Sequence, residues 1–155
     1  MRIEPIACEV GKLRYLFAGD GARLGLVGLA DLQFLEGARK VLIGAYAFAP
    51  FGNNSGETYL VFGNQLNALD TKGGTTADGE INLSDLDGTT GYILNGIAAY
   101  DFSGYSVSSA GDVNGDGVDD LLIGAIYADS GAGETYLVFG NQLNALDTTG
   151  GTTTV

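Results

Sequence analysis

Acidic and amide side chains are concentrated in one nine-residue stretch, "DVNGDGVDD", at residues 112–120. The stretch holds four aspartates and one asparagine, and it contains no lysine or arginine. Two carboxylates about 4 Å apart repel each other by roughly 4 kcal/mol at an effective dielectric constant near 20. Because a bound cation relieves this repulsion, the composition of the stretch indicates a cation site.

The spacing of the oxygen-bearing residues favours calcium. Asp112, Asn114 and Asp116 stand at positions one, three and five, a glycine at position six allows a sharp bend, and Val118 at position seven can offer its carbonyl oxygen. Asp120 adds a carboxylate at position nine. Hard oxygen ligands in this number suit Ca²⁺, whereas Mg²⁺ demands a tighter octahedron and keeps more of its water. The alternative is that "NGDG" is only a turn, which the four letters alone would favour.

The loop is not of the EF-hand type. Its twelfth position is Ile123, where an EF-hand carries a bidentate glutamate, and the flanking "LLIGA" is typical of a strand. The same absence argues against a dockerin, which also needs an acidic twelfth position. β structure must therefore position the loop.

An internal repeat in the sequence indicates which β segments flank the loop. "GETYLVFGNQLNALDT" occurs at residues 56–71 and again, letter for letter, at 133–148, and "LIGA" occurs at 42–45 and 122–125. The chain thus divides into a first unit at about 41–93 and a second at about 94–155, which ends inside a repeat. Residues 1–40 are either a divergent repeat or an unrelated leader, and both interpretations stay open.

Each unit has the periodicity of strands. The segments "ETYLVF", "DLLIGA", "GYSVSSAG", "EINLSDLDG" and "GYILNGIAA" are short, rich in β-branched or apolar residues, and separated by turn pairs such as Asn-Gly and Asp-Gly. No stretch beyond the N-terminal region shows a sustained helical stripe. We predict an all-β protein of short antiparallel strands.

The segment "FSGYSVSSAGDVNGDGVDDLLIGA" at residues 102–125 resembles the FG-GAP repeat, the blade unit of the integrin-α-type β-propeller. It joins a Phe-x-Gly strand, the acidic loop and an Ile-Gly-Ala strand, although Ile126 stands where the family has proline. The resemblance implies antiparallel propeller blades, about two repeats in an incomplete ring. It also implies Ca²⁺ ligands at Asp112, Asn114, Asp116, Val118 and Asp120.

The resemblance further implies a non-catalytic scaffold for extracellular recognition or cell adhesion. A protein or glycan ligand would bind a loop face. Because a propeller needs about four to eight blades, we expect this chain to be an excerpt of a longer protein, to self-associate to complete a ring, or to expose an aggregation-prone edge. The family occurs outside cells or on their surface, although no signal peptide is visible in "MRIEPIACEV".

Composition excludes several classes of function. The net charge of -12 repels phosphate backbones, so nucleic acid is not an expected partner, and no apolar run is long enough to span a membrane. The chain has no histidine and one cysteine, Cys8, which excludes a disulfide framework and a Cys/His zinc site within one chain. The lack of histidine also disfavours an enzyme.

Two rival functions come from other classes. A lectin-like carbohydrate-binding module would need aromatic and amide side chains on one face, and Phe51, Asn53, Asn54 and Tyr127 are the loop residues that could supply them. An accessory region of a larger secreted hydrolase would show catalytic sequence beyond either end in the parent gene.

The first unit is expected to lack a metal. Aligning Asp31 with Asp112 makes "DLQFLEGARK" at 31–40 the counterpart of the acidic loop. In that alignment Leu35 replaces Asp116, and Arg39 occupies the ninth position, where a guanidinium opposes a cation.

Overall fold

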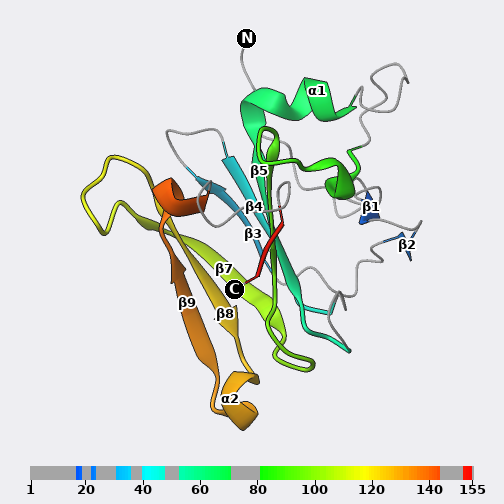
Figure 1. The fold of residues 1–155 in the computed structure, drawn as a ribbon, viewed down its shortest axis with the longest axis vertical. Coiled ribbons are helices and arrows are strands. Elements are labelled where there is room, and N and C mark those ends of the chain that lie inside the picture. Colours follow the sequence, from blue (N-terminus) through cyan, green and yellow to red (C-terminus); the bar gives the residue numbers. More distant parts are fainter. Residues whose placement is uncertain are drawn as a thin grey trace.

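The computed structural model shows two main β-sheets packed against each other (Figure 1). It describes residues 17–18, 22–23, 31–35, 40–47, 53–70, 81–143 and 152–154. The strands are β1 (Phe17–Ala18), β2 (Ala22–Arg23), β3 (Asp31–Leu35), β4 (Lys40–Ala45), β5 (Glu57–Phe62), β6 (Gly91–Asn95), β7 (Ser103–Gly111), β8 (Asp120–Ala125), β9 (Glu134–Val138) and β10 (Thr152–Thr154). The helices are short: η2 (Gly63–Gln65), α1 (Leu66–Asp70), η3 (Leu83–Asp85), α2 (Ala128–Gly131) and η4 (Gly140–Gln142).

The first sheet has the strand order β10-β6-β5-β4-β3. Its central ladder is antiparallel, with Leu42 opposite Leu60 and Leu60 opposite Tyr92. The β-branched and aromatic residues of "KVLIGA" and "ETYLVF" suit such a ladder because their side chains pack well on a pleated surface. β10 pairs with β6 in parallel. A separate two-stranded sheet joins β1 and β2.

The second sheet has the order β7-β8-β9 and repeats the arrangement of β3, β4 and β5. Ile123 of β8 lies opposite Val107 of β7 and Tyr136 of β9, just as Ile43 lies opposite Leu32 of β3 and Tyr59 of β5. The repeat in the sequence is therefore a repeat of three antiparallel strands.

The core has two parts. One lies between the two sheets, and the other lies on the opposite face of the first sheet. Leu42, Leu60, Tyr92 and Leu94 of the first sheet form one cluster with Leu143, which follows η4, and with buried residues of the second sheet, namely Val107, Leu121, Ile123 and Val138. Since side chains alternate along a strand, the neighbouring residues of β4 and β5 face the other way. They form a second cluster with the residues of the helical segments, with members Ile43, Ala45, Tyr59, Val61, Leu69, Leu83 and Leu86. The first sheet is thus covered on both faces.

Two glycines allow the sheets to approach closely. A Cβ atom added to Gly44 of β4 would lie 2.1 Å from the carbonyl oxygen of Gly104 in β7. Gly104 itself has a φ of +79°, which L side chains rarely adopt. Gly44 is the glycine of the Ile-Gly-Ala strand in the first unit. Gly104 is the glycine of the Phe-x-Gly strand in the second unit. Both motif glycines are therefore explained by one contact between the sheets.

The all-β expectation is confirmed, with three differences in detail. "DLQFLEGARK" was aligned with the acidic loop, but Asp31–Leu35 is strand β3 and pairs with β4, so this alignment was wrong. "EINLSDLDG" contributes the helical turn η3, with Asn82 capping it through a bond from the Ser84 amide, rather than a strand. Leu66–Asp70 is a helix of five residues, too short to give a helical stripe in the sequence. The described strands form two stacked sheets and the small β1-β2 sheet, and not a closed ring.

Candidate metal centre and loop faces

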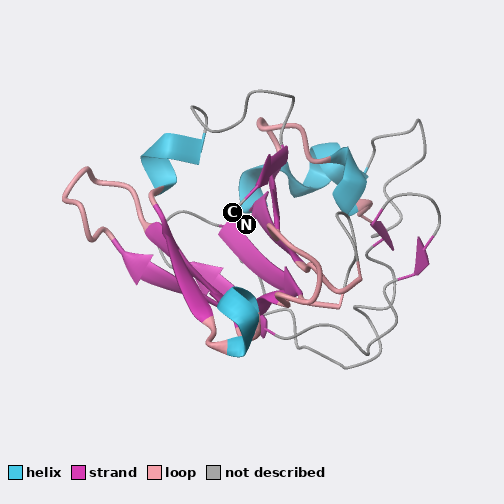
Figure 2. Cartoon of the chain, turned by 60° about the horizontal axis from the view of Figure 1, so that its bottom comes forward, coloured by secondary structure: helices cyan, strands magenta, loops and turns pink. Residues whose placement is uncertain are grey.

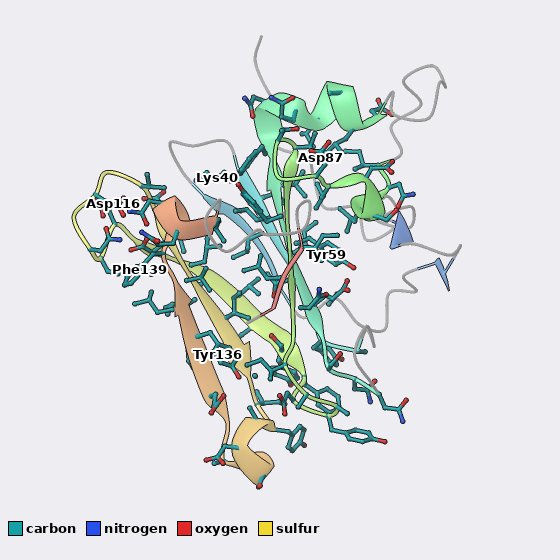
Figure 3. The ribbon with its side chains drawn as sticks, viewed as in Figure 1. Lys40, Tyr59, Asp87, Asp116, Tyr136 and Phe139 are labelled. Atoms are coloured by element: carbon teal, nitrogen blue, oxygen red, sulfur yellow. The ribbon has the colours of Figure 1, made fainter. Side chains whose placement is uncertain are left out.

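The acidic loop joins β7 to β8 and projects from the end of the second sheet, where Asp116 is labelled in Figure 3 and the loop is drawn in pink in Figure 2. Residues 112–117 are all exposed. Gly115 and Gly117 have φ values of +78° and +87°, so the loop turns sharply at two points where glycine is favoured. The predicted bend at the sixth position is therefore confirmed.

Three predicted ligands share one turn. The backbone N–H of Asp116 donates to Asp112 Oδ1 at 2.9 Å and to Asn114 Oδ1 at 3.0 Å. Asp112 Oδ2 accepts from the Gly117 N–H at 2.9 Å, and Asp116 Oδ1 accepts from the Val118 N–H at 2.8 Å. The loop therefore gathers the side-chain oxygens of Asp112 and Asn114 around one backbone amide.

Asp120, the fourth predicted side-chain ligand, is placed differently. It is fully buried at the start of β8. Its Oδ2 accepts from the Val113 N–H at 3.1 Å, and its Oδ1 accepts from the Gly140 N–H at 2.9 Å. Asp120 thus ties the beginning of the acidic loop to the turn after β9, a role that the sequence analysis did not assign to it.

The side-chain oxygens that the loop brings together could supply part of the ligand set of a hard cation. Among the described residues, no three carboxylate, imidazole or thiol groups converge closely enough to count as a metal cluster. The converging oxygens of Asp112 and Asn114 come from one carboxylate and one amide, and such a mixture is typical of calcium loops, as is a backbone carbonyl such as that of Val118. Calcium binding at these residues stays a prediction.

A comparison with protein families identifies the unit that carries the loop. The family description "FG-GAP repeat" matches residues 103–138, which span β7, the acidic loop, β8, α2 and β9. Residues 103–138 are therefore similar to an FG-GAP repeat. The resemblance seen in the sequence is thereby confirmed for this segment. A comparison with curated proteins found no match to the chain.

At the other end of the segment 103–138, aromatic rings from β7 and from several loops meet. Tyr46 contacts Phe102 and Tyr105, with ring centroids 6.0 Å and 5.1 Å apart, and Phe102 contacts Tyr127 at 5.3 Å. An open hollow of about 480 Å³ lies beside them. It is lined by Ala99, Tyr100, Asp101, Phe102, Tyr127, Ser130 and Gly131.

The hollow partly matches the loop cluster expected for a lectin. Tyr127 lines it, and Asn53 Nδ2 donates to the hydroxyl of Tyr100 at 2.9 Å. Asn54 contributes its backbone carbonyl, which accepts from the Phe102 N–H at 3.1 Å. Phe51 lies outside the described residues. The loop cluster expected from the sequence did not include residues 99–102. These residues line the hollow and lie in the connection between β6 and β7.

The backbone around the hollow is strained. Tyr100 and Phe102 have φ values of +70° and +56°, and Asp129 and Ser130 have +49° and +59°. A left-handed conformation costs a non-glycine residue roughly 1–2 kcal/mol. Tyr100 is nevertheless held there by a 2.7 Å bond from its N–H to the Asn53 carbonyl. Such strain tends to gather at functional sites, where it fixes side chains in position.

Among the described residues, no helix is long and apolar enough to cross a membrane.

Proposed function

We propose that the chain is a calcium-binding, non-catalytic repeat segment of the β-propeller type, serving as a scaffold for recognition or adhesion on the cell exterior. The observation that carries the proposal is the FG-GAP match over residues 103–138. FG-GAP repeats typically occur in extracellular or cell-surface proteins. The stacking of two mainly antiparallel sheets through one apolar core also supports a propeller-type architecture, because neighbouring blades must bury their facing sides.

The proposed ligands are Asp112, Asn114, Asp116, the carbonyl of Val118 and Asp120. Bound calcium would neutralise the carboxylates of an exposed loop that contains no basic residue. The ion would therefore act structurally, by holding the connection between β7 and β8. Recognition would fall to the loops at the opposite end of the strands.

Calcium binding is tested by thermal unfolding with calcium or with a chelator. For the parent protein we expect calcium to raise the melting temperature, since saturation at a hundred times the dissociation constant stabilises the folded state by about 2.7 kcal/mol. Asp116→Asn should abolish this response. Asp119→Asn is the matched control, because Asp119 carries the same charge in the same loop but is not in the ligand set.

Two outcomes would contradict the proposal. If neither variant changes the response, the loop is not the site. If calcium has no effect on the folded parent, the loop is only a turn. Asp120 is unsuitable as the sole test, because its bonds to the amides of Val113 and Gly140 make it important for stability with or without calcium.

A second candidate function, carbohydrate binding, is favoured by the aromatic hollow. Tyr100 and Tyr127 are 54% and 55% exposed, so their rings can stack on a sugar, and the hollow includes a carboxylate and a hydroxyl that can bond to sugar hydroxyls. A glycan array probed with the parent and with Tyr127→Ala tests it. A signal that disappears in the variant supports the lectin-like function, and one that survives excludes this hollow as the site. Val113→Ala, a change of an exposed apolar residue at the other end of the repeat, is the control.

A further inference from the structure

The dipeptide Asn-Gly occurs twice in the chain, at residues 95–96 and 114–115. Such a dipeptide can modify itself, because the nitrogen of the glycine can attack the side-chain amide carbon of the asparagine, and glycine has no side chain to obstruct the approach. The two copies lie in different surroundings. Asn95 ends β6 and is 3% exposed, whereas Asn114 and Gly115 are exposed in the acidic loop.

The attacking nitrogen is free at one copy and committed at the other. The Gly96 N–H donates to the Gly56 carbonyl at 2.9 Å. Among the described residues, no hydrogen bond engages the Gly115 N–H. Because the nitrogen must lose its proton as it attacks, a donor that is already bonded between two strands has to break that bond first. Of the two glycines, only Gly115 therefore offers its nitrogen without opening a sheet.

The side-chain carbonyl is activated at Asn114 and not at Asn95. Oδ1 of Asn114 accepts from the Asp116 N–H at 3.0 Å. When the glycine nitrogen adds to the amide carbon, negative charge develops on this oxygen, and a backbone N–H that already points at it stabilises that charge. Oδ1 of Asn95 is buried and has no hydrogen-bond partner among the described residues. The same attack at Asn95 would leave the developing charge without a donor.

The space available for ring closure differs as well. A Cβ atom added to Gly115 would meet nothing within 4 Å, whereas one added to Gly96 would lie 2.0 Å from the Ser55 carbonyl oxygen. Closing the ring requires the backbone to turn so that the glycine nitrogen approaches the asparagine side chain. The backbone packed beside Gly96 opposes this turn, and the open loop at Gly115 does not. Asn114 is also accessible to the water that completes the reaction.

We propose that Asn114 and Gly115 form a self-modification site at which the protein deamidates, and that Asn95 and Gly96 are protected from the same reaction. The Gly115 nitrogen forms a bond to Asn114 Cγ, the bond from Cγ to Nδ2 breaks, and the side-chain nitrogen leaves as ammonia with the proton that Gly115 loses. Water then opens the resulting succinimide at either of its carbonyl carbons. The product at position 114 is an aspartate, or an isoaspartate whose backbone is longer by one methylene group.

Either product changes the charge of the acidic loop. It adds one carboxylate to a stretch that already holds four aspartates. Water is the only co-reactant, so the reaction needs no second protein. Because the released ammonia diffuses away, the change is irreversible. The loop therefore gains negative charge with the age of the molecule, while the strands that carry it stay the same.

The test follows the peptides that contain Asn114 and Asn95 by mass spectrometry while the full-length protein is incubated in a mildly alkaline buffer with a chelator. Replacing an amide by a carboxylate gives a defined mass gain, and an isoaspartyl methyltransferase with a labelled methyl donor detects the isoaspartate. In the folded protein we expect Asn114 to convert at least about tenfold faster than Asn95, which corresponds to a barrier lower by about 1.4 kcal/mol. In denaturant, where neither copy is held by the fold, the two rates should approach each other.

Two variants assign the signal. Asn114→Gln should remove the mass gain from the loop peptide, whereas Asn53→Gln replaces another exposed asparagine and should leave it unchanged. The proposal is overturned if Asn114 does not convert in the folded protein or if Asn95 converts as fast. It is also overturned if the difference between the copies persists in denaturant, which would assign it to local sequence and not to the fold.

One consequence of the reaction rests on the proposed function. If Asn114 is a calcium ligand, the added carboxylate at position 114 should change the calcium affinity of the incubated protein, as calorimetric titration would measure. An unchanged affinity after conversion would contradict the ligand role of Asn114 and leave the deamidation itself established. Failure of Asn114 to convert would overturn the present inference and leave the calcium proposal as it stands.

Discussion

Glu57 and Glu134 occupy the same position of the repeated segment in different surroundings. Glu57 is 6% exposed in the first sheet and accepts a hydrogen bond from the Tyr59 hydroxyl, whereas Glu134 is exposed and accepts one from Tyr136 at 2.5 Å. Burial raises the pKa of Glu57 to about 7, and the bond from Tyr59 offsets part of that effect. Burial, and next the charge of Glu57, also raises the pKa of Tyr59.

The raised pKa of Glu57 predicts a stability loss as pH increases. The folded state holds this proton up to about pH 7, while the unfolded state releases it near its ordinary pKa of 4.5. The folded state therefore binds more protons between these values, and the free energy of unfolding falls through this range, by on the order of 3 kcal/mol from this group. Glu57→Gln should remove that component, as urea unfolding from pH 4.5 to pH 8 would show.

Glu134→Gln is the control for this pH dependence, since the same substitution at the exposed copy should leave the slope of the parent. If both variants keep the parental slope between pH 4.5 and pH 7, Glu57 is ionised in the folded protein and the predicted shift is wrong.

At the level of single residues, the tight turn of the acidic loop was predicted from the sequence, whereas its role as a metal site stays a prediction. The alternation of Asp112, Asn114 and Asp116 with two glycines specifies a tight turn, and local sequence is sufficient to form one. The role of Asp120 could not be predicted, because its partner at Gly140 is 20 residues away and is brought close only by pairing of β8 with β9.

Among the strands, the pairing of β4 and β8 with their neighbours depends on small residues. The glycines of "LIGA" are Gly44 and Gly124, and they have different neighbours. A Cβ on Gly44 would lie 2.1 Å from the backbone oxygen of Gly104, whereas one on Gly124 would lie 2.5 Å from the Oγ of Ser106, a rotatable and exposed side chain. The backbone contact cannot relax without moving one sheet relative to the other.

We therefore predict that Gly44→Ala destabilises the protein by about 1–3 kcal/mol or more, and that Gly124→Ala costs much less. Melting temperatures of the two variants provide the measurement, with a drop of roughly 2–4 °C per kcal/mol for a chain of this size. Equal losses in both variants would show that the contact between the sheets does not limit the approach of β4 and β7.

The strands themselves were predictable where they repeat, and less so where they do not. β7, β8 and β9 follow from alternation and from the turn residues between them. β3 was misaligned because the two aspartates at 31 and 112 look equivalent, although Leu32 is the counterpart of Val107 in the ladders. Only residues 36–39 separate β3 from β4, against residues 112–119 between β7 and β8, and this length difference is the signal that was overlooked.

At the scale of the whole molecule, the acidic loop and the aromatic hollow lie at opposite ends of the second sheet. The loop follows the last residue of β7, and the hollow surrounds its first residues and the turn after β8. None of the residues that line the hollow belongs to the acidic loop. We expect calcium and any ligand of the hollow to bind independently, and calorimetric titration of one in the presence of the other measures this.

A dependence of either affinity on the other ligand would show that the second sheet transmits a conformational change between its ends. The appropriate reference is Asp116→Asn, in which the acidic loop is altered while the residues of the hollow stay in place.

The duplicated segment also affects how the chain reaches this structure. During folding, β6 can meet either β5 or β9, and the two offer the same sequence and the same ladder of backbone groups. Local affinity cannot distinguish them, so the choice depends on loop length and on which sheet has already formed. Residues 63–90 connect β5 to β6, whereas β9 follows β6 after two further strands. A chain that pairs β6 with β9 first must undo that pairing, which makes exchange between the two copies an expected kinetic trap.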